Sequence, residues 1–265
     1  MKRQEVIGLL KIILDNICKA YPGANEIEVL RDINLTINSG EFICILGPSG
    51  CGKSTLLEII AGLQPPSRGQ ILLDGIPVTG PNPDIGVVFQ DSSLYPWRTV
   101  LENVELGPEI KGMNKKLRRE LAKKYIKMVN LSGFEDRSPH QLSGGMRQRV
   151  GIARTLINNP KVLLMDEPFG AVDYLTRLQL QNELKDIWGK EKKTIIFVTH
   201  DISEAVFLGE RVVVLTPRPG KVKSIIDIPL KRSRDRNDPV ILEIEQKIYR
   251  IINHAGPEYE PEYYI

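Results

Sequence analysis

The chain has 265 residues, of which 42% are hydrophobic and 26% charged, a balance that excludes disordered and low-complexity proteins. Lysine and arginine total 36 against 33 acidic residues, and a net charge of +3 gives no electrostatic reason to expect nucleic acid as a partner. No apolar run approaches the ~18 residues of a membrane-spanning helix, and no signal-peptide pattern follows the N-terminus. Three cysteines without metal-type spacing favour a reducing cytosol over a disulfide framework or a zinc site.

Apolar and β-branched segments alternate with helical patterns along the chain. Strands are predicted at residues 30–37, 42–46, 71–73, 85–89, 162–166, 194–199 and 212–216. Helices are predicted at residues 53–61, 115–130, 145–158 and 173–191. Several of the strands are continuous apolar runs, as parallel strands buried on both faces are. This alternation predicts an α/β fold in which helices pack on a largely parallel sheet.

Two segments depart from the alternation. Residues 91–159, approximately, are helical without a strong strand, which predicts a helical subdomain inserted between two strands of the core. Within it, residues 111–127 predict an amphipathic helix with a solvated basic face. The sequence from residue 231 onward is polar, acidic and aromatic, so we expect a main domain over 1–230 and a loosely attached tail over 231–265.

A phosphate-binding loop is predicted between the strand at 42–46 and the helix after it. The pattern G-x-x-x-x-G-K-[ST] is formed by Gly47, Pro48, Ser49, Gly50, Cys51, Gly52, Lys53 and Ser54. The glycines allow a tight turn whose N–H groups point at phosphate oxygens, and the helix N-terminus adds partial positive charge. Lys53 is expected to reach the β- and γ-phosphates and Ser54 to ligate Mg²⁺, with Thr55 also on the nucleotide. Cys51 lies in the loop without a base, so no catalytic role is expected for its thiol.

Two carboxylates end the apolar strand at 162–166. Asp166 at the strand tip is placed to hold Mg²⁺ through its water shell. Glu167, one residue on, could polarise the attacking water as a general base. The loop and these carboxylates together fit kinases, GTPases, helicases and transporters alike.

A Ser-Gly-Gly sequence before the helix at 145–158 distinguishes among these classes. Ser143, Gly144 and Gly145 offer a hydroxyl and bare N–H groups at a helix N-terminus, which makes a second anion cradle. One ATP does not need two cradles from one chain. We therefore expect this cradle to grip the γ-phosphate of ATP bound to a second copy.

With these three motifs in this order, the chain resembles the ATP-binding subunits of ABC transporters over about residues 18–229. In that family the motifs are the Walker A loop, the signature and the Walker B strand. The resemblance implies a P-loop NTPase with a RecA-like core, an inserted helical subdomain and a small antiparallel β part near the N-terminus. It also implies that ATP and Mg²⁺ are bound and that ATP is hydrolysed.

The resemblance implies roles for four further residues. Tyr21 resembles the aromatic residue that stacks on adenine, since a flat ring suits a flat base. Gln90 is similar to the Q-loop glutamine that senses Mg²⁺ and the γ-phosphate. Asp173 resembles the D-loop aspartate at the dimer interface, and His200 the switch histidine that contacts the γ-phosphate. The expected catalytic residues are thus Lys53, Gln90, Glu167 and His200, and the expected metal ligands are Ser54, Gln90 and Asp166.

Segments 93–104 and 216–222 resemble the bacterial importer branch for nitrate, sulfonate, taurine and related solutes. Pro96 and Trp97 predict an exposed apolar patch for a partner, with a packed Trp97 as the alternative. The branch implies a peripheral protein on the inner face of the cell membrane that drives a separate integral-membrane permease. A periplasmic or extracellular solute-binding protein would be an indirect partner.

Two other functions stay open. One is an ABC-type ATPase unlinked to transport, which the short chain and the lack of a coiled-coil insertion disfavour. The other is a P-loop kinase for a small molecule, which would have no use for the cradle beginning at Ser143.

Overall fold

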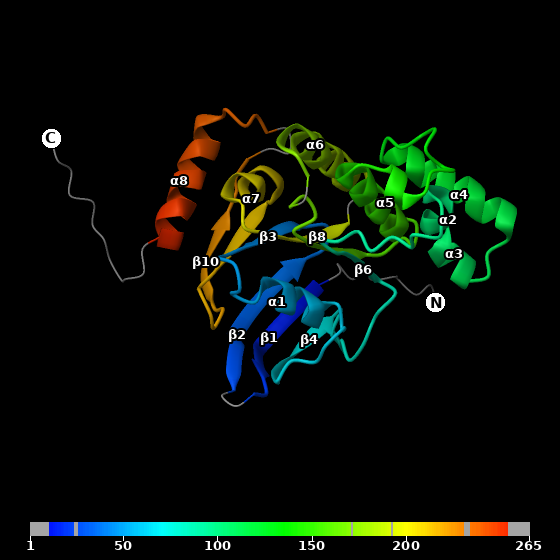
Figure 1. Cartoon of the computed structure of the whole chain (residues 1–265). Coiled ribbons are helices and arrows are strands. Elements are labelled where there is room, and N and C mark those ends of the chain that lie inside the picture. Colours follow the sequence, from blue (N-terminus) through cyan, green and yellow to red (C-terminus); the bar gives the residue numbers. More distant parts are fainter. Residues whose placement is uncertain (1–10, 24–25, 171, 192, 231–233, 254–265) are drawn as a thin grey trace, which may run out of the picture.

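The computed structural model describes residues 11–23, 26–170, 172–191, 193–230 and 234–253, and a six-stranded sheet forms the centre of this part of the chain. Its strand order is β10-β9-β3-β8-β7-β6, and all neighbours run parallel except β10, which is antiparallel to β9 (Figure 1). The strands are β3 (Phe42–Leu46), β6 (Ile85–Val88), β7 (Val162–Asp166), β8 (Thr194–Thr199), β9 (Arg211–Leu215) and β10 (Val222–Asp227). The predicted α/β architecture is confirmed.

The central strands are buried on both faces because their side chains feed two separate cores. In β3, Cys44 and Leu46 join the apolar cluster that lies under the helices of the second half of the chain. Ile43 and Ile45 point to the other face and pack with helix α1 and the small sheet. A strand that is buried on both faces of the sheet has an unbroken run of apolar residues, so such strands can be predicted from the sequence.

A second sheet, in the order β2-β1-β4-β5, is antiparallel and confirms the expected β part near the N-terminus. Its strands are β1 (Lys11–Tyr21), β2 (Ile27–Asn38), β4 (Arg68–Leu73) and β5 (Ile76–Pro77). Strand β1 was not predicted. Its register shifts between Leu14 and Ile17, where Asn16 has a φ of 51°, so the two-residue alternation of apolar side chains is interrupted.

Helices α2 to α5 form the inserted helical subdomain, at the right of Figure 1. They are α2 (Val100–Val104), α3 (Leu106–Ile110), α4 (Lys115–Met128) and α5 (Gly144–Leu156), with a short 3₁₀ helix at Pro139–Gln141. The basic helix α4 is amphipathic as predicted, with Ala122, Tyr125 and Ile126 buried. Leu117, an apolar residue near the start of the same helix, is exposed.

The remaining helices cover the sheet and correct one expectation. They are α1 (Lys53–Ile60), α6 (Tyr174–Glu191), α7 (Ile202–Leu208) and α8 (Pro239–Asn253). Helix α8 buries Ile241, Ile244 and Ile248 in the same apolar cluster as α7. The expectation of a loosely attached tail is therefore wrong for residues 239–253, because an apolar stripe at helical spacing was hidden among polar residues. The Tyr-rich end, residues 254–265, lies outside the described residues.

The segment before α8 is held by two arginines. Arg234 donates to the carbonyl oxygens of Val206, Phe207 and Gly209, at the C-terminal end of α7, at 2.6–3.1 Å. Arg236 stacks on the ring of Phe207, 3.6 Å from its centroid, and donates to Gln181 on α6.

No helix in the described ranges combines the length and apolar character that spanning a bilayer requires.

Candidate functional site

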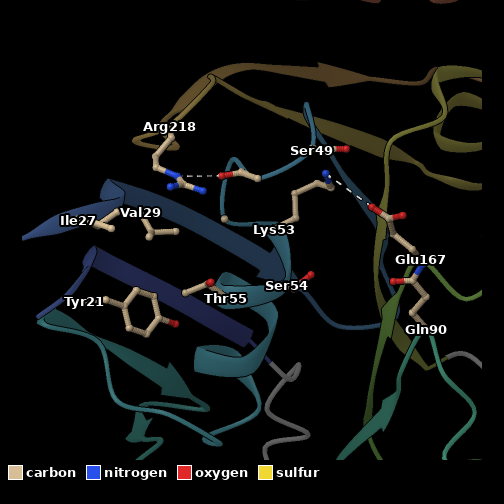
Figure 2. Close-up of a pocket in the computed structure, with 12 residues that line it drawn as sticks. Tyr21, Ile27, Val29, Ser49, Lys53, Ser54, Thr55, Gln90, Glu167 and Arg218 are labelled. Atoms are coloured by element: carbon tan, nitrogen blue, oxygen red, sulfur yellow. Dashed lines mark hydrogen bonds and ion pairs between the residues drawn. The ribbon is translucent and has the colours of Figure 1, made fainter. Parts of the chain in front are cut away.

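A cavity of about 560 Å³ lies between the loop after β3, the edge of the small sheet and the end of β7 (Figure 2). It is lined by Tyr21, Ile27, Val29, Ser49, Gly50, Gly52, Lys53, Ser54, Thr55, Gln90, Glu167 and Arg218. All of these except Ile27, Val29 and Arg218 were proposed from the sequence. The fold thus brings the predicted adenine-stacking residue, the phosphate loop and the predicted general base to one place.

The glycines of the loop are required by its geometry. Gly52, which precedes α1, has a φ of 102°, and a Cβ there would lie 2.7 Å from Leu30 Cδ2. Gly50 has a φ of 75°, and a Cβ on Gly47 would lie 2.8 Å from the sulfur of Cys51. A side chain at these positions would fill or distort the turn, so the loop keeps its backbone free for a phosphate group.

Lys53 places a buried cation over this loop. Its Nζ donates to the carbonyl oxygens of Gly47 at 2.9 Å and Pro48 at 3.1 Å, and lies 3.7 Å from Glu167 Oε1. A buried ammonium with several polar neighbours is held in one position rather than free in solvent. The side chain is therefore fixed where phosphate oxygens would enter the loop.

Ser54 and Asp166 meet at the end of β7. Ser54 Oγ donates to Asp166 Oδ1 at 3.2 Å, and burial raises the pKa of Asp166 while this hydrogen bond opposes the rise. A hydroxyl and a carboxylate oxygen are the hard ligands that Mg²⁺ takes, so the pair fits the ion. Within the described part of the chain, no three His, Cys, Asp or Glu side chains are grouped to hold a metal. A magnesium ion here would need phosphate oxygens or water to complete its shell.

Glu167 lies between Lys53 of the loop and His200, the residue that follows β8. Its φ is 41°, a left-handed conformation uncommon for glutamate, and its N–H donates to Val198 O at 3.0 Å. His200 Nδ1 lies 2.9 Å from Glu167 Oε2. One carboxylate oxygen thus faces Lys53 and the other faces His200, so the carboxylate is positioned by β8 as well as β7.

Gln90 reaches the cavity from the end of β6, and α5 holds the surrounding segment. Gln148 on α5 donates to Phe89 O at 3.3 Å. The guanidinium of Arg154 on the same helix donates to Ser92 O at 2.7 Å and Ser93 O at 2.9 Å. The helix that begins at the Ser-Gly-Gly sequence is therefore tied to the backbone on both sides of Gln90.

The cradle residues Ser143, Gly144 and Gly145 do not line this cavity. Ser143 Oγ caps α5 by accepting from Met146 N–H at 3.3 Å. Gly145 is buried, and a Cβ there would lie 2.7 Å from Thr176 Cγ2 on α6. The structure therefore places the predicted second cradle apart from the chain's own phosphate loop.

Three other predicted residues have clear local roles. Asp173 accepts the N–H of Thr176 at 3.0 Å, a backbone hydrogen bond that lowers the pKa of Asp173, and it also lies outside the cavity. Tyr21 donates its hydroxyl to Gln64 Oε1 at 2.9 Å while its ring borders the cavity. Cys51 is buried, and burial raises the pKa of its thiol.

Sequence reasoning missed the contribution of Arg218. Its Nε donates to Gly50 O at 3.2 Å, as the dashed line in Figure 2 shows. In the sequence, the segment around it shows only a resemblance to importers. A contact between residues separated by 168 positions leaves no periodicity from which it could be found.

Several known proteins are similar to this chain over most of its length. The family model described as ABC transporter matches residues 30–170. An uncharacterized ABC transporter ATP-binding protein of Methanocaldococcus jannaschii is 56% identical over 244 residues, 92% of this chain and 91% of that protein. A taurine import ATP-binding protein of Yersinia pestis is 54% identical over 193 residues, 73% of this chain and 76% of that protein. A dimeric ATP-binding cassette, solved in a post-hydrolysis state with ADP and Pi, superimposes with a TM-score of 0.74 at 39% identity, covering 83% of this chain and all of that one.

Proposed function

Because the chain belongs to the ABC transporter family and is an ABC-type ATPase, we propose that it drives the import of a small solute through a separate membrane permease. The observation that carries the proposal is the convergence of Lys53, Ser54 and Glu167 on one cavity beside a phosphate loop, with Asp166 hydrogen-bonded to Ser54. The similarity to a taurine importer and the resemblance of segments 93–104 and 216–222 support a sulfonate-, taurine- or nitrate-like solute.

The residues of the cavity support a hydrolytic reaction with defined roles. Lys53 and the loop N–H groups hold the β- and γ-phosphates, and Tyr21 stacks on the adenine. Ser54, Asp166 and Gln90 would hold Mg²⁺, which would neutralise negative charge on the phosphates. Glu167 takes a proton from the water that attacks the γ-phosphorus, and the bond to ADP breaks. His200 keeps the carboxylate of Glu167 in place.

We propose that two copies bind ATP between them. The cradle that begins at Ser143, and Asp173, lie outside the chain's own cavity, so in this arrangement they complete the site of the other copy. The dimeric solved relative supports this arrangement. The phosphate loop of one copy and the helix α5 of the other then hold the same nucleotide.

An apolar surface on the helical subdomain supports a membrane partner. Trp97 is 74% exposed and Ile110 is 77% exposed, and the ring of Tyr95 lies 5.2 Å from that of Trp97. Beside them, a cavity of about 510 Å³ lies between β6 and α3 and is lined in part by Phe89 and Tyr95. Such a patch of large apolar side chains is typical of a protein–protein contact. We propose that a cytoplasmic segment of the permease binds here and holds the protein at the inner face of the membrane.

Uptake experiments test the function. The chain is expressed with a permease and a solute-binding protein from the same genome, in cells that lack their own system, and uptake of labelled taurine, an alkanesulfonate and nitrate is measured. We expect uptake of one of these with the wild type and none with Glu167→Gln at equal expression. ATP-independent uptake, or uptake that Glu167→Gln leaves intact, would contradict the proposal.

A further inference from the structure

Arg218 lies in a connection that is fixed against the phosphate loop. Residues 216–221 join β9 to β10, and Thr216 Oγ1 accepts Lys221 N–H and donates to Pro219 O, each at 3.0 Å. Gly220 donates to Val29 O at 2.8 Å, and a Cβ on Gly220 would lie 2.2 Å from Cys51 O. The connection therefore packs on both β2 and the phosphate loop, which fixes the backbone that carries Arg218.

The guanidinium of Arg218 is a cation at the wall of the cavity. Its Nε donates to Gly50 O, and no carboxylate in the described ranges forms an ion pair with it. Lys53, by contrast, already has Glu167 at 3.7 Å. An exposed positive charge at the wall of an anion-binding cavity, with two of its nitrogens still able to donate, is suited to phosphate oxygens.

Figure 2 places Arg218 at the end of the cavity away from Glu167 and Gln90, beside Ile27 and Val29. The γ-phosphate must lie near Glu167 if that residue activates the attacking water. Arg218 therefore faces the part of the nucleotide nearer the base. We infer that Arg218 is a further nucleotide-binding residue whose terminal nitrogens contact the α- and β-phosphates of ATP and ADP, and this inference rests on the proposed ATP site.

The experiment measures affinity for ADP, because ADP carries both phosphates and lacks the γ-phosphate that the other copy's cradle would grip. Titration of a fluorescent ADP analogue, with ADP as competitor, gives the Kd. Arg218→Gln retains an N–H donor for Gly50 O and removes the charge, whereas Arg218→Lys retains the charge. Lys221→Ala removes a positive charge from the same connection at a residue that does not line the cavity. Lys53→Ala tests the cavity itself.

We expect Arg218→Gln to weaken ADP binding about 10-fold, Arg218→Lys to restore most of the loss, and Lys221→Ala to bind like the wild type. The difference should shrink as salt is added, because exposed charges are screened. Melting curves without nucleotide check that each variant is folded. If Arg218→Gln does not fold, the comparison of Arg218→Lys with the wild type still tests the contact.

Wild-type affinity in Arg218→Gln, or equal losses in Arg218→Gln and Lys221→Ala, would overturn the assignment of Arg218. A loss of ADP affinity in Arg218→Gln that Arg218→Lys does not restore would show that Arg218 only fixes the backbone of Gly50 through its hydrogen bond. In each of these results, weak binding by Lys53→Ala would leave the proposed ATP site intact. Wild-type affinity in Lys53→Ala would instead overturn the site itself.

Discussion

We expect replacement of Glu167 to separate nucleotide binding from hydrolysis. Its carboxylate lies 3.7 Å from Lys53 Nζ and 2.9 Å from His200 Nδ1. Glu167→Gln keeps the size of this side chain and removes the carboxylate that would accept the proton. We expect ATP to bind and turnover to fall about 10²–10⁴-fold, the usual contribution of a general base. Removing a negative charge near the γ-phosphate should also favour the closed dimer.

Size-exclusion chromatography and phosphate release check this expectation. The variant should elute as a dimer with ATP and Mg²⁺ and as a monomer with ADP, whereas the wild type should return to monomer as ATP is consumed. A variant that stays monomeric with ATP, or releases phosphate at the wild-type rate, would show that Glu167 is not the base.

Asp166 leads to a pH-dependent prediction. Burial raises its pKa, so the native protein holds this proton to a higher pH than the unfolded chain does. The wild type therefore loses stability as the pH rises from the ordinary aspartate pKa of about 3.9 through the raised value, and Asp166→Asn, which does not titrate, is spared this loss. Asparagine can still accept the Ser54 hydroxyl.

Without nucleotide or metal, Asp166→Asn should melt at the wild-type temperature or a few degrees above it near neutral pH. The difference should decrease as the pH is lowered toward 4. Differential scanning fluorimetry across this range measures it. A variant that is less stable than the wild type only at neutral pH would show that folding lowers the pKa of Asp166 instead of raising it.

For individual residues, the sequence predicts those site residues that lie within one continuous motif. The loop residues from Gly47 to Ser54, and the pair Asp166 and Glu167, needed only the neighbouring strand and helix to be recognised. Arg218 could not be predicted, because its contact with Gly50 depends on how β9, β2 and the loop pack in three dimensions.

Among the elements, α5 allows the shared-site arrangement to be tested. Ser143→Ala removes the hydroxyl that caps α5, which costs about 1 kcal/mol of stability. In the proposed dimer it also removes a group that holds the other copy's γ-phosphate. We expect ATPase activity to be lost while ADP binding by the single chain stays at the wild-type level. Equal losses of activity and ADP affinity would place Ser143 in the chain's own site.

Gly145 is a poor choice for this experiment. A Cβ there would meet Thr176 at 2.7 Å, so a loss of activity in Gly145→Ala could reflect displaced packing between α5 and α6.

Helix α8 provides a prediction about stability. Ile248 is fully buried and Tyr249, the next residue, is 62% exposed. We expect Ile248→Ala to lower the free energy of unfolding by about 2–5 kcal/mol and Tyr249→Ala to change it by less than about 0.5 kcal/mol. Urea unfolding measures both values. Equal and small effects would mean that α8 does not contribute to the core.

Prediction of elements from the sequence succeeded where the apolar pattern was regular. Strands β3, β7 and β8 match their predicted bounds, because double burial leaves unbroken apolar runs. Strand β1 was missed because a bulge shifts its alternation. Helix α8 was missed because its three buried isoleucines lie among charged residues.

For the whole molecule, the sequence predicted the architecture because its motifs occur in the order the fold requires. Two apolar clusters lie on opposite faces of the larger sheet, one packed with most of the helices and the other with helix α1 and the small sheet. Which surface meets a partner is not encoded in that pattern, since exposure depends on the final packing of the helical subdomain.

The exposed ring of Trp97 leads to a prediction at this scale. Trp97→Ser should leave ATP binding unchanged and reduce co-purification of the protein with its permease at least 10-fold, because aromatic anchors dominate binding at such surfaces. Tyr249→Ala, which removes an exposed aromatic side chain on α8, serves as the control. Undiminished co-purification of Trp97→Ser would place the permease elsewhere.

The contacts that Arg234 and Arg236 make with α6 and α7 determine where the chain can be shortened without loss of structure. A fragment ending at residue 230 would leave the carbonyl oxygens of Val206, Phe207 and Gly209 without the guanidinium that caps them. Through Gln181 and Glu204, Arg236 also connects to Thr199, the residue before His200. Fusion partners and affinity tags therefore belong after residue 253, and we expect a fragment trimmed to its sequence motifs to position Thr199 and the adjacent His200 differently.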